Sequence, residues 1–117
     1  MGDLYKVWAV FRPHLLDDVA WSLVKMGIGE FTASEARGLG NQKGHTGLYR
    51  GSEYEVDFLP KIKLEVIVEG DLWRDKTVAT IARTAKTGNI GDGKIFVEPV
   101  DSGINIIDGT SYKPTYP

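Results

Sequence analysis

The sequence predicts an α+β fold made of one βαββαβ unit. Three observations support this prediction. The length of 117 residues suits one domain with its own core. Strand-like and helix-like patterns succeed one another in the order strand, helix, strand, strand, helix, strand. No repeat, linker or low-complexity segment interrupts this succession, so we interpret residues 1–117 as a single domain.

The first half of the unit is a strand, a helix and a weaker strand. The stretch "LYKVWAVF" (Leu4–Phe11) is rich in β-branched and aromatic residues, which favour a strand. From His14 the apolar residues follow the i, i+3, i+4, i+7 spacing of an amphipathic helix, which Gly27 and Gly29 end. "FTASEAR" (Phe31–Arg37) then predicts a second strand.

The second half begins with a strong strand, "KIKLEVIV" (Lys61–Val68), whose apolar residues alternate. A helix over Asp71–Lys86 and a strand over Lys94–Val97 follow, and "GINII" (Gly103–Ile107) is a candidate for a short edge strand. This order gives an antiparallel sheet with both helices on one face, the ferredoxin-like arrangement. Apolar residues on both sides of the strands predict that oligomerisation buries the uncovered face.

Composition excludes several classes of function. The absence of cysteine excludes disulfides, thiolate metal sites and a cysteine nucleophile. His14 and His45 lie far apart, which predicts no metal site. A net charge of -2 without a basic block disfavours nucleic acid as a partner. We expect a cytoplasmic protein, because no signal peptide and no apolar run of about 20 residues is found.

A long glycine-rich segment, "GLGNQKGHTGLYRGSEYEVDFLPK" (Gly38–Lys61), joins the second and third strands. It is far longer than the two to five residues, roughly, of an ordinary hairpin loop. Its tyrosines, leucines and phenylalanine are too many for a solvated linker. This composition indicates a loop that docks in alternate states.

A second glycine-rich segment, "GNIGDGK" (Gly88–Lys94), has the first part of a Walker pattern. Ile95 stands where that pattern needs Ser or Thr, and a helix precedes the loop where a strand should. A P-loop is therefore excluded. Two interpretations stay open: a helix cap with a turn, or a backbone nest that receives an anion with Asp92 and Lys94.

The motifs "QKGHT", "LYRGSEY", "DFLPK" and "GDGKIF" occur in this order, and the chain resembles the PII signal-transduction family from Arg12 to about Val97. The resemblance implies a homotrimer with three adenine-nucleotide clefts between subunits. Each cleft is bounded by the T-loop, about residues 38–61, and the B-loop, about residues 87–94. Family members bind ATP or ADP, many bind 2-oxoglutarate through magnesium, and the T-loop engages transporters and enzymes.

The resemblance also implies roles for individual residues. Those around the nucleotide are Thr32, Gly38, Leu39, Gly40, Asn41, Gln42, Glu65, Ile67, Gly91, Asp92, Gly93 and Lys94, with Thr32, Glu65 and Ile67 near the adenine and ribose. Those around a small anionic effector are Gly40, Gln42, Lys43 and Lys61. Tyr54 holds the position that is uridylylated in some members, and Ser52 the one phosphorylated in others.

Departures from the family pattern predict an altered ligand preference. Asn41, Asn105 and Ile107 stand where the family has three phosphate-binding arginines. We therefore expect ADP or AMP to bind at least as well as ATP, with magnesium only if ATP binds. The divergent tail, about residues 103–117, carries "DGTSYKPTYP", which predicts an extended segment that packs against some surface instead of continuing the sheet. Such changes resemble two branches of the family, the carboxysome-associated, bicarbonate-responsive proteins and the metal-efflux-linked members, and we favour the first.

These observations predict a non-enzymatic regulator with no catalytic residues. It senses adenine nucleotide and a small anion such as bicarbonate, and its T-loop controls a membrane transporter or a metabolic enzyme. The alternative is a conventional nitrogen regulator that senses ATP, ADP and 2-oxoglutarate. An enzyme is disfavoured because no positioned base or nucleophile is evident. An RNA-binding domain is disfavoured because the aromatic motif and basic sheet of such domains are missing.

Overall fold

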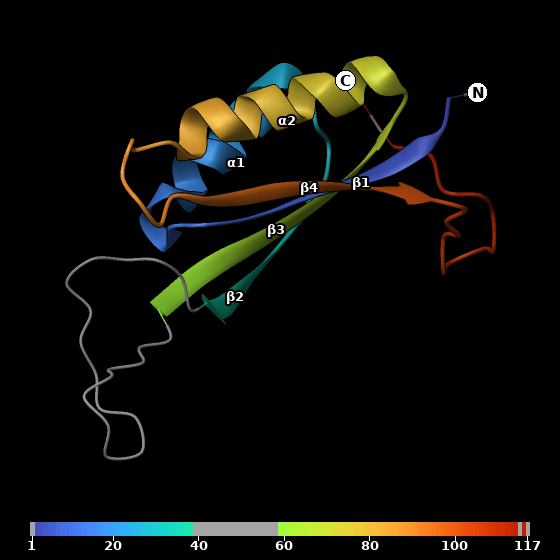
Figure 1. Ribbon diagram of the computed structural model, residues 1–117. Coiled ribbons are helices and arrows are strands. Elements are labelled where there is room, and N and C mark those ends of the chain that lie inside the picture. Colours follow the sequence, from blue (N-terminus) through green and yellow to red (C-terminus); the bar gives the residue numbers. More distant parts are fainter. Residues whose placement is uncertain (1, 39–58, 115, 117) are drawn as a thin grey trace.

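The computed structural model has the predicted ferredoxin-like βαββαβ architecture (Figure 1). It describes residues 2–38, 59–114 and 116. The helices and strands are, in order, β1 (Leu4–Phe11), the 3-10 turn η1 (Pro13–Leu15), α1 (Leu16–Met26), β2 (Thr32–Gly38), β3 (Leu59–Glu69), α2 (Asp71–Ala85) and β4 (Gly93–Val100).

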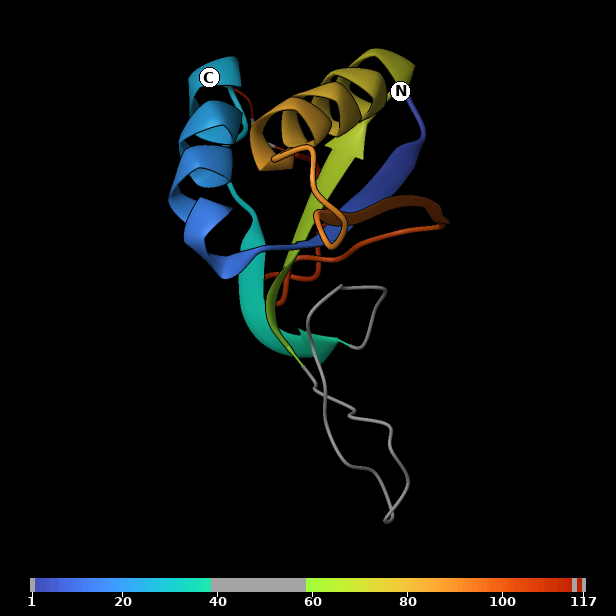
Figure 2. The same cartoon turned by 60° about the vertical axis from the view of Figure 1, so that its left-hand side comes forward.

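The four strands form one antiparallel sheet in the order β2-β3-β1-β4. β1 lies at the centre, where Val7 pairs with Val66 of β3 on one side and Val97 of β4 on the other. Both helices lie on one face of this sheet (Figures 1 and 2). In the part of the chain that the structure describes, no helix covers the other face.

The core lies between the sheet and the helices. Alternate residues of β1 and β3 point into it, as the sequence pattern predicts, and both helices add apolar side chains. Its most completely buried members include Val7, Phe11, Val19, Leu23, Leu64, Val66, Val68 and Ile81. Among the described residues, no helix is long and apolar enough to cross a membrane.

The sheet face opposite the helices, here called the open face, is less apolar than the sequence suggested. The ring of Trp8 stacks on that of Phe96 with 4.7 Å between centroids. Around this aromatic pair lie charged side chains: Lys6 forms a 2.9 Å ion pair with Glu65, and the Trp8 indole donates a 2.6 Å hydrogen bond to Glu98. The open face is therefore an aromatic patch surrounded by paired charges.

The predicted elements differ from the structure at a few boundaries. β4 runs on to Val100, three residues beyond the prediction, because it is an edge strand that tolerates Pro99. The expected edge strand over Gly103–Ile107 was wrong. Ile104 makes only an isolated bridge with Ser111 inside a hairpin, which turns sharply on itself and leaves no strand to extend the sheet.

Candidate functional site

The B-loop between α2 and β4 is built around the carboxylate of Asp92. This carboxylate accepts hydrogen bonds from the backbone N–H groups of Thr87 and Gly88, each at 2.9 Å, and from the Thr87 hydroxyl. The hydroxyl contact is the main cause that holds the pKa of Asp92 well below its usual range. Asp92 is thus an ionised internal support of the loop.

Arg12 joins this loop to the end of β1. Its Nε lies 3.3 Å from Oδ1 of Asp92, and its Nη2 donates a 2.9 Å hydrogen bond to the carbonyl of Ile90. The sequence interpretation did not include Arg12 among the site residues. One signal in the sequence could have identified it. Arg12 is a cation that directly follows a predicted strand and precedes Pro13, and a charged residue at the end of a strand lies at the edge of the sheet.

Lys61, predicted as an effector residue, lies at the same place. Its ammonium group donates a 2.8 Å hydrogen bond to the carbonyl of Gly91. Burial, followed by repulsion from Arg12, lowers the pKa of Lys61. An anion bound beside these two cations would relieve their repulsion, so the arrangement favours a small anion chemically.

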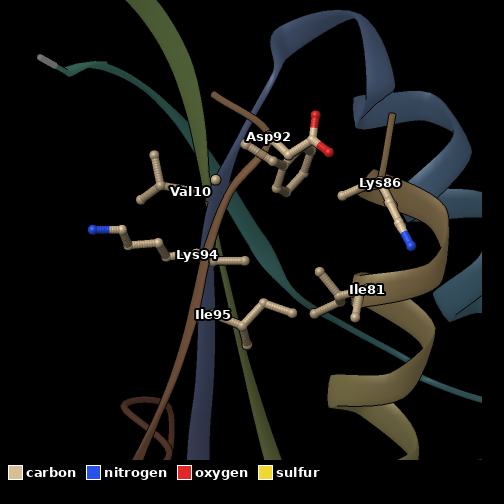
Figure 3. Close-up of a pocket in the computed structure, with 11 residues that line it drawn as sticks. Val10, Ile81, Lys86, Asp92, Lys94 and Ile95 are labelled. Atoms are coloured by element: carbon tan, nitrogen blue, oxygen red, sulfur yellow. The ribbon is translucent and has the colours of Figure 1, made fainter. Parts of the chain in front are cut away.

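Gly93 and Lys94 fix where β4 begins. Gly93 has φ 118°, and a Cβ at this position would lie 1.8 Å from the carbonyl oxygen of Val10, so only glycine fits. Lys94 pairs with Val10 in the sheet. Figure 3 shows Lys94 and Val10 on the side of the strands away from α2, while Ile95 points toward Ile81. The Lys94 side chain therefore extends on the open face.

Two cavities flank these residues. One of about 310 Å³ lies between the end of α2 and the first residues of β4, and apolar side chains dominate its lining: Ala9, Val10, Phe11, Ile81, Ala82, Ala85, Lys86, Asp92, Gly93, Lys94 and Ile95. The other, of about 400 Å³, lies where β2 ends and β3 begins and is lined by Pro13, Glu35, Ala36, Arg37, Pro60, Lys61 and Ile62. Lys61 therefore lies between the B-loop and the second cavity.

The residues predicted near adenine and ribose form a separate group on β2 and β3. Thr32 pairs with Glu65 in the sheet, and Ile67 lies two residues further along β3. A hydrogen bond from Lys6 is the main cause of the lowered pKa of Glu65. Glu65 pairs with Trp8, Ile67 with Lys6 and Lys94 with Val10, so Lys94 lies two residues from Glu65 and four from Ile67 along the sheet, or roughly 7 and 13 Å.

Several predicted site residues lie outside the described residues, and their roles stay predictions. They are Leu39, Gly40, Asn41, Gln42, Lys43, Ser52 and Tyr54. Gly38 is the last residue of β2, directly before this segment. Among the residues that the structure describes, no three metal-binding side chains form a group that could hold an ion.

The fold and the site define a class of protein: a small ferredoxin-like domain with a pre-organised glycine-rich loop at one end of its sheet. Comparison with known families agrees with this class. The model of the family described as "Nitrogen regulatory protein P-II" matches residues 4–109. The chain belongs to the PII family.

Curated relatives and solved structures agree. The chain is 55% identical over 104 residues to the nitrogen regulatory protein P-II of Haemophilus influenzae, covering 89% of this chain and 92% of the relative. Its identity to the nitrogen regulatory protein P-II 1 of Escherichia coli K12 is 54% with the same coverage. The structure of the Bacillus subtilis GlnK–ATP complex superposes with a TM-score of 0.77, at 38% identity, covering 95% of this chain and 96% of that chain.

Family membership confirms two sequence-based predictions. The resemblance to the PII family is correct, and so is the expectation of a regulatory signal-transduction protein instead of an enzyme. The fold, the B-loop and the family thus agree on a regulator whose ligands and partners are the next question.

Proposed function

We propose that this protein is a cytoplasmic PII-type sensor that assembles as a homotrimer and binds an adenine nucleotide in three clefts between subunits. The observation that carries the proposal is the B-loop, whose arrangement Arg12, Lys61 and Asp92 hold through hydrogen bonds. Pre-organisation of this kind reduces the free-energy cost of binding. The structural relative GlnK, solved as an ATP complex, supports an adenine nucleotide as the ligand.

The separation of the two residue groups supports a cleft between subunits. Within one chain, Ile67 and Lys94 lie at levels of the sheet about 13 Å apart. A second copy that brings its B-loop to the first copy's Thr32, Glu65 and Ile67 would complete a site for base and phosphates together. The proposal therefore places the ligand between two copies of the chain.

We further propose that ADP or AMP binds at least as tightly as ATP. The side chain of Asn105 donates a 3.1 Å hydrogen bond to Thr110 inside the C-terminal hairpin, and Ile107 is 93% exposed. Neither residue supplies a cation to a third phosphate. Each lost charge-assisted hydrogen bond is worth about 1.5 to 3 kcal/mol, or roughly ten- to a hundredfold in affinity. Magnesium belongs to this proposal only if ATP binds.

The proposed effector is a small anion, with bicarbonate as the first choice. Lys61 beside Arg12 offers two cations without a metal ion, and the resemblance adds Gly40, Gln42 and Lys43. Binding would change the state of the T-loop, through which the protein would regulate a membrane transporter or a metabolic enzyme in carbon metabolism. Modification of Tyr54 or Ser52 would act on the same loop.

The second candidate is a conventional nitrogen regulator that senses ATP, ADP and 2-oxoglutarate and controls nitrogen utilisation. The names of the curated relatives at 54% and 55% identity favour this candidate. The two candidates differ in the nucleotide that binds best and in the anion that strengthens its binding, so one set of titrations separates them.

The test is calorimetric titration of the full chain with ATP, ADP and AMP, each alone, with bicarbonate, and with 2-oxoglutarate and magnesium. We expect ADP or AMP to match ATP and bicarbonate to tighten nucleotide binding. Lys61→Met should abolish the bicarbonate effect. Lys25→Met, exposed in the last turn of α1, is the matched control and should keep it. ATP binding more than about tenfold tighter than ADP, strengthened by 2-oxoglutarate, would establish the nitrogen regulator instead.

A further inference from the structure

The C-terminal tail returns from its hairpin and attaches to the domain at two tyrosines. Figure 1 shows the hairpin beyond the end of β4. The phenol of Tyr112 donates a 2.5 Å hydrogen bond to Glu30, in the segment before β2. The ring of Tyr116 stacks on Trp73 of α2 at 4.0 Å with an interplanar angle of 7°, and its hydroxyl accepts the 3.0 Å N–H bond of Glu69.

These contacts form a strap, which we define as the described tail residues Tyr112, Pro114 and Tyr116. The strap lies over a surface formed by Ile28, Gly29, Glu30 and Ile67. Its attachment is specific, because each tyrosine makes two kinds of contact. Tyr112 is partly buried and donates its hydroxyl to Glu30, while Tyr116 stacks on Trp73 and accepts the N–H of Glu69. Burial and the bond to Glu30 raise the pKa of Tyr112 to about 12, so its phenol remains a donor at neutral pH.

The covered surface includes a residue that the proposed function needs. Ile67 is one of the three residues predicted to lie near the adenine and ribose, and Glu30 lies two residues before Thr32, another of the three. An adenine base is a flat aromatic ring, as is the tyrosine side chain. A base that packs on Ile67 from this side would have to take the volume that the strap occupies.

We propose that the strap and the base of the nucleotide compete for the surface around Ile67, so that nucleotide binding releases the strap. This inference rests on the proposed function, because it assumes that the predicted base-binding residues do bind a base. The apparent affinity for the nucleotide is then the intrinsic affinity multiplied by the fraction of molecules in which the strap has left this surface. If the strap is docked in about nine molecules of ten, the affinity falls about tenfold.

The same competition would link nucleotide binding to the hairpin that precedes the strap. The hairpin before the strap presents Ile106 and Ile107, which are 102% and 93% exposed. Tyr112 lies at the junction of hairpin and strap, since its N–H donates a 2.8 Å bond to the carbonyl of Gly103. Strap release would therefore free the base of the hairpin as well, and nucleotide binding would change how this apolar tip is held.

The experiment measures ADP affinity by calorimetry in the full chain and three variants. Tyr112→Phe removes only the hydroxyl that binds Glu30, and Tyr116→Leu removes the stack and the acceptor while keeping an apolar side chain. Ile106→Ser changes the exposed hairpin tip and is the matched control. We expect both tyrosine variants to bind ADP about three- to tenfold more tightly, and Ile106→Ser to bind as the parent does.

Amide exchange at Glu69 gives a second readout that depends on the strap alone, because the Glu69 N–H donates to Tyr116. Saturating ADP should accelerate this exchange in the parent chain. Unchanged ADP affinity in both tyrosine variants, with unchanged exchange at Glu69, would overturn the strap and leave the proposed function intact. Weaker ADP binding in the variants would mean that the tail belongs to the site. No adenine-nucleotide binding by any chain would overturn the proposed function itself, and the competition with it.

Discussion

Arg12 and Asp92 lie 80 residues apart in the sequence, yet the guanidinium Nε of one is 3.3 Å from the carboxylate of the other. Both side chains are about three-quarters buried, at 23% and 24% exposure, so water screens this ion pair less than an exposed one. Arg12 also holds the carbonyl of Ile90. The end of β1 therefore determines where the B-loop lies on the sheet.

Replacement of Arg12 should loosen the B-loop. In Arg12→Ala the amides of Thr87 and Gly88, which donate to Asp92, should exchange faster because the carboxylate loses its anchor on β1. Arg12→Lys should give an intermediate rate, since an ammonium group cannot reproduce the planar fork that holds two acceptors. Arg83→Ala, on the exposed side of α2, is the control. Parent-like exchange in Arg12→Ala would mean that the loop keeps its arrangement without β1.

Two glycines of the B-loop should differ in their tolerance of a methyl group. Gly93→Ala places a Cβ against the carbonyl of Val10 at a φ of 118°, so we expect a loss of at least about 2 kcal/mol in the free energy of unfolding. Gly88→Ala has an unfavourable φ of 90° but open space, so we expect only about 1 to 2 kcal/mol. Urea unfolding of both variants measures the difference. Equal losses would contradict the close approach at Gly93.

The stability of the protein should depend on the ionisation of Asp92. Its pKa is lowered in the folded state, chiefly by the Thr87 hydroxyl, so its contribution to stability is present above the unfolded carboxyl pKa of about 4. That contribution is lost as the pH falls through the folded pKa. Asp92→Asn should be less stable than the parent at pH 7, and the gap should shrink below about pH 4. Thermal unfolding across this range measures it, and a gap independent of pH would contradict this account.

The sequence predicts elements well where the signal is local. The bounds predicted for β1 are those observed, Leu4–Phe11, because the apolar and β-branched pattern starts and stops within a few residues. The end of α1 is also correct, since Gly27 caps the helix with a φ of 110°. β4 was predicted too short, because a proline stops a central strand and this strand lies at the edge of the sheet.

The candidate site was predicted less completely, because it depends on contacts between distant residues. The resemblance gave Lys61 and Gly91 separate roles, and the hydrogen bond between them appears only in the structure. Arg12 binds Asp92 because the fold brings the B-loop back to the end of β1. The spacing of apolar residues in the sequence does not indicate this contact. The tail was expected to pack against some surface instead of continuing the sheet, but the stacking of Tyr116 on Trp73 depends on where α2 begins after β3. Local patterns contain none of this information.

The open face should carry the proposed trimer contact. Trp8 and Phe96 stack at its centre, Phe96 is 46% exposed, and Lys63 lies 4.9 Å from the Trp8 ring. Light scattering of the parent should give three times the chain mass of 12.9 kDa. Trp8→Lys would bury an additional charge in the contact at a cost of several kcal/mol, so the mass should fall toward 12.9 kDa and ADP binding should be lost with the cleft.

Trp21→Lys is the matched control for this prediction. Trp21 is 63% exposed on α1, on the helix side of the sheet, so the same change there should leave the trimer mass and the ADP affinity as they are in the parent. Circular dichroism should be unchanged in both variants, because neither side chain belongs to the core between sheet and helices. A Trp8→Lys protein that keeps the trimer mass would place the subunit contact elsewhere. Dissociation by Trp21→Lys alone would move it to the helices.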